Sequence, residues 1–202
     1  MAAESPADET MVGAIVRNPV VQTLGVMTLV SVATWAATIV GLGRLFVLAI
    51  PIESRPWALV TSVYAHLGPG HLFANAVMIA LAGGIVVWST TAIRFHLFFV
   101  ATGAIAGAVQ VVVAYAMGTP LAVLGSSGAA FALVGYVLTS NSISQVVTGW
   151  LNLSARVVII VVAIIATWLT VEWSAPGSAL LAHFTGAVLG LAAGHIRLLH
   201  TP

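Results

Sequence analysis

The sequence has no cysteine and no lysine, and only 5% of its 202 residues are charged. Without cysteine the chain has no disulfide, no thiolate metal site and no redox motif. A net charge of +1 provides no basic surface for nucleic acid. Soluble domains carry about 25% charged residues, so an ordinary soluble domain is also excluded. With 60% hydrophobic residues, the chain is expected to have the lipid bilayer as its solvent.

The apolar runs predict an all-α membrane protein with six transmembrane helices, because a helix needs about 20 apolar residues to cross the bilayer core. The predicted spans are Val21–Val40, His71–Trp88, His96–Met117, Ser126 to about Ser140, Ala155–Val171 and Ser178–Leu198. Residues 45–62 contain proline and charge and are predicted to be an interfacial loop. Residues 1–18 are predicted to be a short disordered tail before one six-helix domain, residues 19–199.

The arginines predict the orientation of the bundle. Six spans place both termini on one side, and four arginines fall on that side against two on the other. By the positive-inside rule the shared side is the cytoplasm, so a multi-pass protein of the cell membrane is predicted. The four predicted inner arginines are Arg17, Arg94, Arg156 and Arg197, and the outer two are Arg44 and Arg55.

The stretch Gly125-Ser126-Ser127-Gly128 lies in a run of 61 residues without a charged side chain. Serine is the common nucleophile that remains in a chain without cysteine. Glycines next to Ser127 let other backbone or a substrate approach its hydroxyl. A serine at a helix start is more often an N-cap, however. The motif alone leaves both interpretations open.

His183 lies at the same predicted depth as Ser127, within two turns of the outer face. At ~1.5 Å per residue it is roughly 7 Å below the start of its helix. A stripe of glycines continues on its helix face: Gly186, Gly190 and Gly194. Such spacing lets two membrane helices pack backbone to backbone, and the helix that begins with Ser127 is the predicted partner. A packing histidine bonded to a carbonyl is the alternative for His183.

Ser127 and His183 together favour nucleophilic acyl transfer, with serine as nucleophile and histidine as base. The reaction also needs hydrogen-bond donors for the developing oxyanion. His71 and Asn75 are four residues apart on one helix face, so both side chains and the Ser127 amide are the predicted donors. Because no aspartate lies in a predicted span, a dyad is expected rather than a triad.

Two other interpretations concern the histidines. His66, His71 and His183 could supply the three ligands of a zinc site, but the chain has no His-Glu-x-x-His and no carboxylate close to them. A solvated polar surface is the alternative for His66, which stands before a Gly-Pro-Gly turn. No metal and no organic cofactor are therefore predicted.

Three motifs in order carry a resemblance to the rhomboid intramembrane serine proteases. The first is His66-Leu-Gly-Pro-Gly-His71-Leu-Phe-Ala-Asn75 with Gly83-Gly84; the second is Gly125-Ser126-Ser127-Gly128 with Phe131; the third is Ala182-His183-Phe-Thr-Gly186-Ala-Val-Leu-Gly190. The resemblance covers about residues 20–198. It implies that Ser127 is the nucleophile, that His183 is the base, and that Phe131 packs beside the imidazole. It also implies that His71 and Asn75 line an oxyanion hole, with Gly125 and Gly128 packed around the serine.

The activity implied is hydrolysis of a peptide bond in or next to the transmembrane segment of a membrane-anchored protein. Residues 45–62 would be the lateral loop in the outer leaflet. Two positions depart from the family: Ala58 stands where arginine often follows the tryptophan, and Val87 where glutamate often follows the double glycine. The proline found before the serine in inactive relatives is replaced by Ser126.

Two alternatives of other classes remain. One is a non-catalytic rhomboid-like protein that binds membrane clients, disfavoured by the intact Ser127 and His183. The other is a small transporter, disfavoured because no internal repeat and no acidic residue inside a predicted span are seen.

Overall fold

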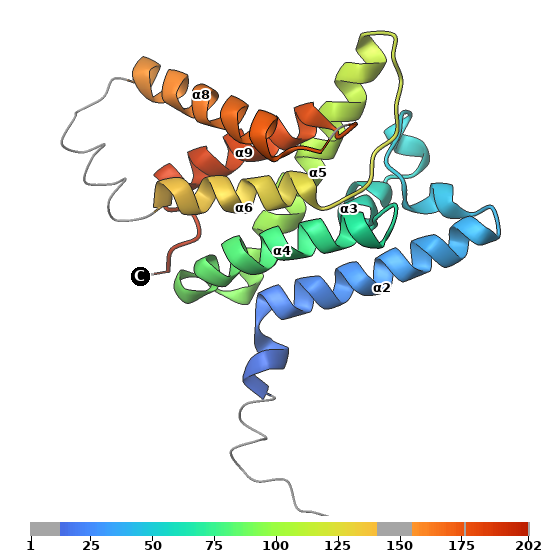
Figure 1. Ribbon diagram of the computed structural model, residues 1–202, viewed down its shortest axis with the longest axis horizontal. Helices are drawn as coiled ribbons and strands as arrows, with labels where there is room; N and C mark the ends of the chain where they lie inside the picture. Colours follow the sequence, from blue (N-terminus) through green and yellow to red (C-terminus); the bar gives the residue numbers. More distant parts are fainter. Residues whose placement is uncertain (1–12, 141–154, 176, 202) are drawn as a thin grey trace, which may run out of the picture.

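The computed structural model describes residues 13–140, 155–175 and 177–201, and this part of the chain is a bundle of helices (Figure 1). The elements are α2 (Pro19–Ile39), η1 (Gly43–Phe46), η2 (Ile52–Ser54), α3 (Ala58–Tyr64), α4 (Pro69–Val86), η3 (Val87–Ser89), α5 (Ala92–Ala116), α6 (Ser127–Ser140), α8 (Ala155–Trp173) and α9 (Leu180–His195). Residues 13–17 are helical, which differs from the disordered tail predicted there. The rest of that predicted tail, residues 1–12, lies outside the described residues.

Several helices begin earlier than their apolar runs predict, because caps and prolines fix their first turns. The Asn18 side chain accepts a hydrogen bond from the Val20 amide at 2.9 Å, and Pro19 occupies the first helical position of α2. Pro69 begins α4 in the same way. Thr91 caps α5 by accepting from the Arg94 amide at 3.3 Å.

The prediction of an all-α membrane bundle is confirmed. Within the described residues, three helices are long and apolar enough to cross a membrane: Pro19–Ile39, Pro69–Ser89 and Ala92–Ala116. The apolar helices of α6, α9 and residues 160–173 of α8 are shorter. The number of six spans therefore stays a prediction. α9 ends at His195, before the predicted Leu198, and Arg197 beyond it has a positive φ of 53°.

α6 is the central helix of the bundle. It packs against α4, α5 and α9, while α2 lies on the far side of α4 and α8 on the far side of α9 (Figure 1). Every residue from Gly128 to Tyr136 is buried. Ser127 therefore stands at the first residue of the most enclosed helix.

The glycine stripe of α9 packs directly against the backbone of α6, as predicted. A methyl group added at Gly186 would overlap the carbonyl oxygen of Gly128, and one added at Gly190 would overlap that of Ala132. Side chains larger than hydrogen would hold the helices apart, so this contact sets how closely His183 approaches α6.

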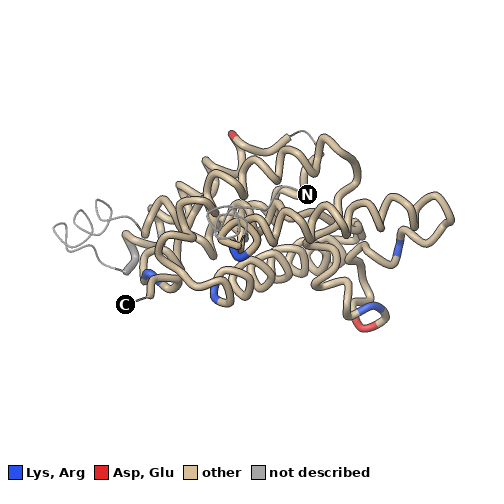
Figure 2. The backbone as a smooth tube through the Cα atoms, turned by 90° about the horizontal axis from the view of Figure 1, so that it is seen from below, with Lys and Arg blue, Asp and Glu red and all other residues tan. Residues whose placement is uncertain are grey.

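Residues 45–62 contain the short element η2, the end of η1 and most of α3. Leu48 pairs with Val123 in an isolated antiparallel bridge, which ties this segment to the chain just before α6. Ala58, the position where arginine was expected from the resemblance, is 1% exposed and packs beside Leu48 and Val111. Figure 2 shows how few charged positions interrupt the long neutral stretches of the bundle.

Candidate active site

The structure brings Ser127 and His183 together from α6 and α9. The Ser127 Oγ lies 2.8 Å from Nε2 of His183. The Phe131 ring stacks on the imidazole with 4.5 Å between ring centroids and 13° between planes. His183 is 5% exposed, and Ser127 is half-buried. The imidazole thus has contacts at its face and at Nε2, and the Ser127 residue is partly accessible.

Ser127 is not the N-cap of its helix. The Ala130 amide donates to the Ser126 carbonyl at 2.8 Å, so Ser126 stands in the capping position and Ser127 is the first helical residue. The capping interpretation of Ser127 is therefore wrong.

A third side chain, Ser174, contacts His183 and was missed from the sequence. Its Oγ lies 2.6 Å from Nδ1 of His183, directly after the end of α8 at Trp173. If Nε2 accepts the Ser127 hydroxyl proton, Nδ1 carries the ring proton and donates it to Ser174. The expected pair of residues thus has a hydroxyl in the place that an aspartate takes in a triad. No signal in the sequence marks Ser174.

Gln110 on α5 also supports the histidine and was missed. Its Oε1 accepts a hydrogen bond of 3.1 Å from the amide of Ala182, the residue before His183. The N-cap position of α9, Ala179, has no side chain able to cap the helix, so Gln110 satisfies one of the free first-turn amides from another helix. An amide side chain inside the apolar run of α5 was the available signal.

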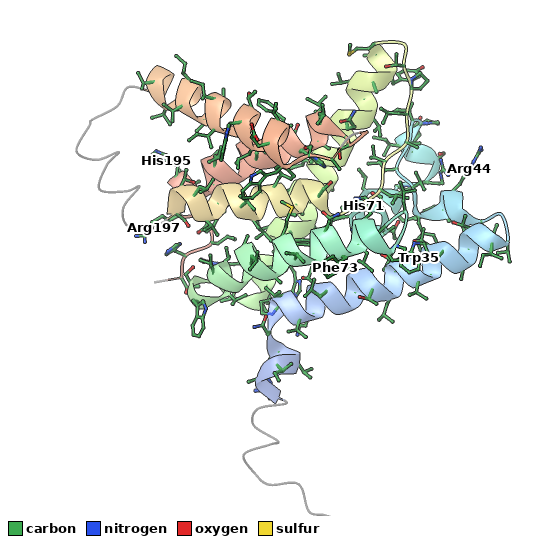
Figure 3. The ribbon with its side chains drawn as sticks, viewed as in Figure 1. Trp35, Arg44, His71, Phe73, His195 and Arg197 are labelled. Atoms are coloured by element: carbon green, nitrogen blue, oxygen red, sulfur yellow. The ribbon has the colours of Figure 1, made fainter. Side chains whose placement is uncertain are left out.

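His71 lies against the turn that leads into Ser127 (Figure 3). A methyl group on Gly125 would be 2.7 Å from the His71 Cε1 atom, and Gly125 has a φ of +132°. Both facts require glycine there. Gly128 is required for a different reason, since a methyl group on it would be 2.7 Å from the Ala106 Cβ.

Asn75 lies one turn along α4 and is 4% exposed. Its Nδ2 donates a hydrogen bond of 2.9 Å to the His71 carbonyl oxygen. An amide nitrogen has two hydrogens, so this bond uses one of its two donors.

His66 is not on a solvated surface, and that interpretation is wrong. It is 0% exposed, and its ring nitrogens lie 3.0 Å from the hydroxyls of Ser31 and Ser126. His66 belongs to the connection between α3 and α4, outside the spanning helices. Burial lowers its pKa to about 4, with a further lowering from the nearby His71 and a smaller opposing effect of the Tyr64 carbonyl.

The alternative of a zinc site has no support in the placement of these rings. The Nε2 atoms of His66 and His183 each face a serine hydroxyl. No group of three side chains among the described residues is arranged to hold a metal ion.

Comparison with known proteins assigns the family. The Rhomboid domain family matches residues 53–200, which is most of the chain. This chain belongs to the rhomboid family. The human protein Rhomboid-related protein 3 is 29% identical over 161 residues, which cover 73% of this chain and 38% of that protein. This rhomboid therefore spans well under half the length of that relative.

In this rhomboid the site combines four features around one serine: an imidazole nitrogen at hydrogen-bond distance, an aromatic ring stacked on that imidazole, a second hydroxyl at its other nitrogen, and a histidine beside the preceding turn. The family and the membrane bundle agree with the resemblance found in the sequence. The roles of the individual residues are proposals, set out next.

Proposed function

We propose that this protein is an intramembrane serine endopeptidase. The observation that carries the proposal is the 2.8 Å contact between the Ser127 Oγ and the His183 Nε2. That distance lies within the range required of a nucleophile and its general base. It is made by residues in the first turns of two helices in tight backbone contact, so the pair is held by the fold.

In the proposed reaction, the Ser127 oxygen attacks the carbonyl carbon of the peptide bond while its proton passes to His183 Nε2. The tetrahedral intermediate collapses when Nε2 returns that proton to the leaving amine. Water then attacks the acyl-serine ester, with the neutral imidazole again acting as base. Both protons pass through the one ring nitrogen that faces Ser127. The serine proton leaves with the amine, and the proton taken from water returns to the Ser127 oxygen when the acid product is released.

Ser174 is proposed to orient the base by accepting the Nδ1 hydrogen at 2.6 Å. A hydroxyl carries no charge, so it fixes the ring and its tautomer but stabilises an imidazolium less than a carboxylate does.

The oxyanion is proposed to bind the Ser127 amide together with His71 and Asn75. The first amides of a helix have no intrahelical partner and point toward the start of the helix, where the His71 ring lies against Gly125. Donors of this kind stabilise charge that develops in the transition state. No metal or organic cofactor is needed for these steps.

The proposed substrates are membrane-anchored proteins cut in or next to their transmembrane segment. Large apolar side chains cover the outside of the bundle, including Ile39 at 85% exposed and Leu67 at 79% exposed, as expected of surfaces in contact with lipid. Six spans with both termini in the cytoplasm, a tail over residues 1–18 and a protease domain over 19–199 remain part of this proposal, with the arginine distribution in support.

Labelling with a fluorophosphonate, together with cleavage of a single-span reporter, tests the proposal. The parent is expected to label and to cut, and Ser127→Ala is expected to do neither while keeping its thermal unfolding midpoint within a few degrees. His183→Ala is expected to be similarly inactive. Ser54→Ala is the matched control, because Ser54 is an exposed serine whose hydroxyl bonds the Pro51 carbonyl.

A folded Ser127→Ala variant that still cuts the reporter would refute the mechanism. If the parent neither labels nor cuts but binds the reporter in a pull-down, the protein is the non-catalytic, client-binding alternative.

A further inference from the structure

Next to the proposed catalytic pair stands a second serine–histidine pair, which the proposed reaction does not use. The Ser126 Oγ lies 3.0 Å from His66 Nε2, and His66 Nδ1 lies 3.0 Å from the Ser31 Oγ. We call these three side chains the buried relay. Ser31, His66 and Ser126 are all 0% exposed, so none of them can meet a substrate. Their effect on the reaction must pass through other residues.

Two backbone groups determine which ring nitrogen of His66 carries the hydrogen. Nδ1 lies 3.1 Å from the Tyr64 carbonyl oxygen, which can only accept, so Nδ1 is protonated. The Ser126 amide, which can only donate, points at Nε2 from 3.3 Å, so Nε2 carries the lone pair. Both contacts require the same neutral tautomer. A second proton would place an N–H at Nε2 against the N–H of Ser126.

The buried relay joins three parts of the fold at the start of α6. Ser31 comes from α2, which also holds the connection through a 2.7 Å bond from Trp35 Nε1 to the His66 carbonyl (Figure 3). The Gly125 amide is tied as well, to the Ser62 carbonyl at 2.8 Å. Two successive amides before Ser127 are therefore fixed, and with them the direction of the Ser127 N–H.

The same ring also supports His71. The rings of His66 and His71 meet edge to face, with 5.0 Å between centroids and 74° between planes. On another side the His71 ring meets Gly125. His71 is thus held between the buried relay and the turn that the buried relay fixes.

We propose that His66 is a positioning residue that preforms the oxyanion side of the site, acting through the Ser126 amide and the His71 ring. It works as the neutral Nδ1–H tautomer. The inference rests on the proposed function, because its kinetic consequence concerns the donors to the oxyanion. Its structural content, the tautomer and the bond to the Ser126 amide, stands independently.

Two substitutions of His66 test the contacts of its two ring nitrogens separately. His66→Asn keeps a donor at the position of Nδ1 but loses the acceptor toward Ser126, whereas His66→Gln places an amide oxygen near the position of Nε2. We expect His66→Asn to lower kcat by ~10²-fold, the cost of a displacement of about 1 Å in the site. His66→Gln is expected to keep most of the parental kcat. KM is expected to be the same in the Asn and Gln variants.

Ser126→Ala is the milder variant. It removes the hydroxyl but keeps the backbone N–H that donates to Nε2, so it is expected to lower kcat only a few-fold. Equal kcat values for the Asn and Gln variants, with equal losses of thermal stability, would show a merely structural residue and overturn the proposal.

A spectroscopic measurement on the 202-residue chain in lipid nanodiscs tests the tautomer directly. With ¹⁵N-labelled histidine, the His66 signals are assigned by their loss in His66→Gln. They are expected to show a protonated Nδ1 and an unprotonated Nε2 at neutral pH. The opposite tautomer would overturn the proposal whether or not the protein cuts a substrate. A parent that neither labels nor cuts, with the expected tautomer, would refute the proposed function and leave the buried relay intact.

Discussion

Gly186→Ala is expected to separate the proposed nucleophile from its base. Gly186 lies three residues after His183 on the face of α9 that meets α6. A methyl group added there would be 2.9 Å from the carbonyl carbon of Gly128 and 3.1 Å from its Cα, and it would overlap the carbonyl oxygen. These atoms are backbone and cannot rotate away. Because non-bonded carbon atoms pack at ~3.5–4.0 Å, the helices must move apart by about 1 Å at the level of Ser127.

Gly186→Ala is expected to lower the stability of the protein only slightly but its activity strongly. Overpacking a close contact destabilises by ~1–3 kcal/mol, but alanine in place of a helical glycine returns about 1 kcal/mol. The net loss of stability is therefore small. A displacement of about 1 Å at a 2.8 Å contact offers no such compensation, and a ~10²-fold fall in rate is expected.

The assay is the rate of fluorophosphonate labelling, measured beside thermal unfolding in the same detergent. Gly25→Ala on α2 is the matched control, because no atom lies within 4 Å of the methyl group it would add. The control should label at the parental rate and unfold at an equal or higher temperature. A Gly186→Ala protein that labels as fast as the parent would refute the link between the glycine contact and the site.

Three further outcomes are expected. His71→Ala and Asn75→Ala should each lower reporter cleavage by ~10²–10³-fold and leave the protein folded; parental rates in both would show that neither side chain binds the oxyanion. Ser174→Ala should lower kcat without changing KM, and Ser174→Thr, which keeps a hydroxyl, should restore it; a rate unaffected by Ser174→Ala would remove this residue from the mechanism. The pKa of His66, lowered from 6.5 to about 4, means that the unfolded chain takes up the proton first. Proton uptake by His66 in the unfolded chain is therefore expected to lower the free energy of unfolding by roughly 3 kcal/mol as pH falls from about 6.5 to about 4. Above about pH 6.5 this effect is absent, and the stability is complete. Unfolding midpoints between pH 7 and 4 should show a smaller decline in His66→Gln than in the parent, and equal declines would contradict the assignment.

The sequence was sufficient for the bundle and for the contact between α6 and α9, because both depend on patterns within one helix. Apolar runs locate helices, and the glycines at Gly186, Gly190 and Gly194 identify the face that packs closely. The helix ends were less well predicted. They depend on caps such as Asn18 and Thr91, which hydropathy does not detect.

The residues around the imidazole could not be predicted, because each comes from a different element. Gln110 reaches the α9 backbone from α5, and Ser174 reaches the ring from the end of α8. A single serine or glutamine has no spacing that relates it to a partner in another helix. His66 was misplaced for a different reason. A histidine in a Gly-Pro turn suggests a surface, whereas polar groups in a membrane protein are satisfied inside the protein.

The neighbouring serines Ser126 and Ser127 contact the two histidines on opposite sides of the site. Side chains of consecutive residues at a helix start point in directions about 100° apart, so the two hydroxyls reach two different histidines. Ser127 meets His183 on α9, and Ser126 meets His66 in the connection before α4. Since both serines have a histidine Nε2 within 3.0 Å, proximity to a base does not distinguish the nucleophile. Exposure does, because Ser126 is 0% exposed while Ser127 is half-buried. Only the second serine can meet a peptide bond, and the first can contribute by holding the turn on which the second stands.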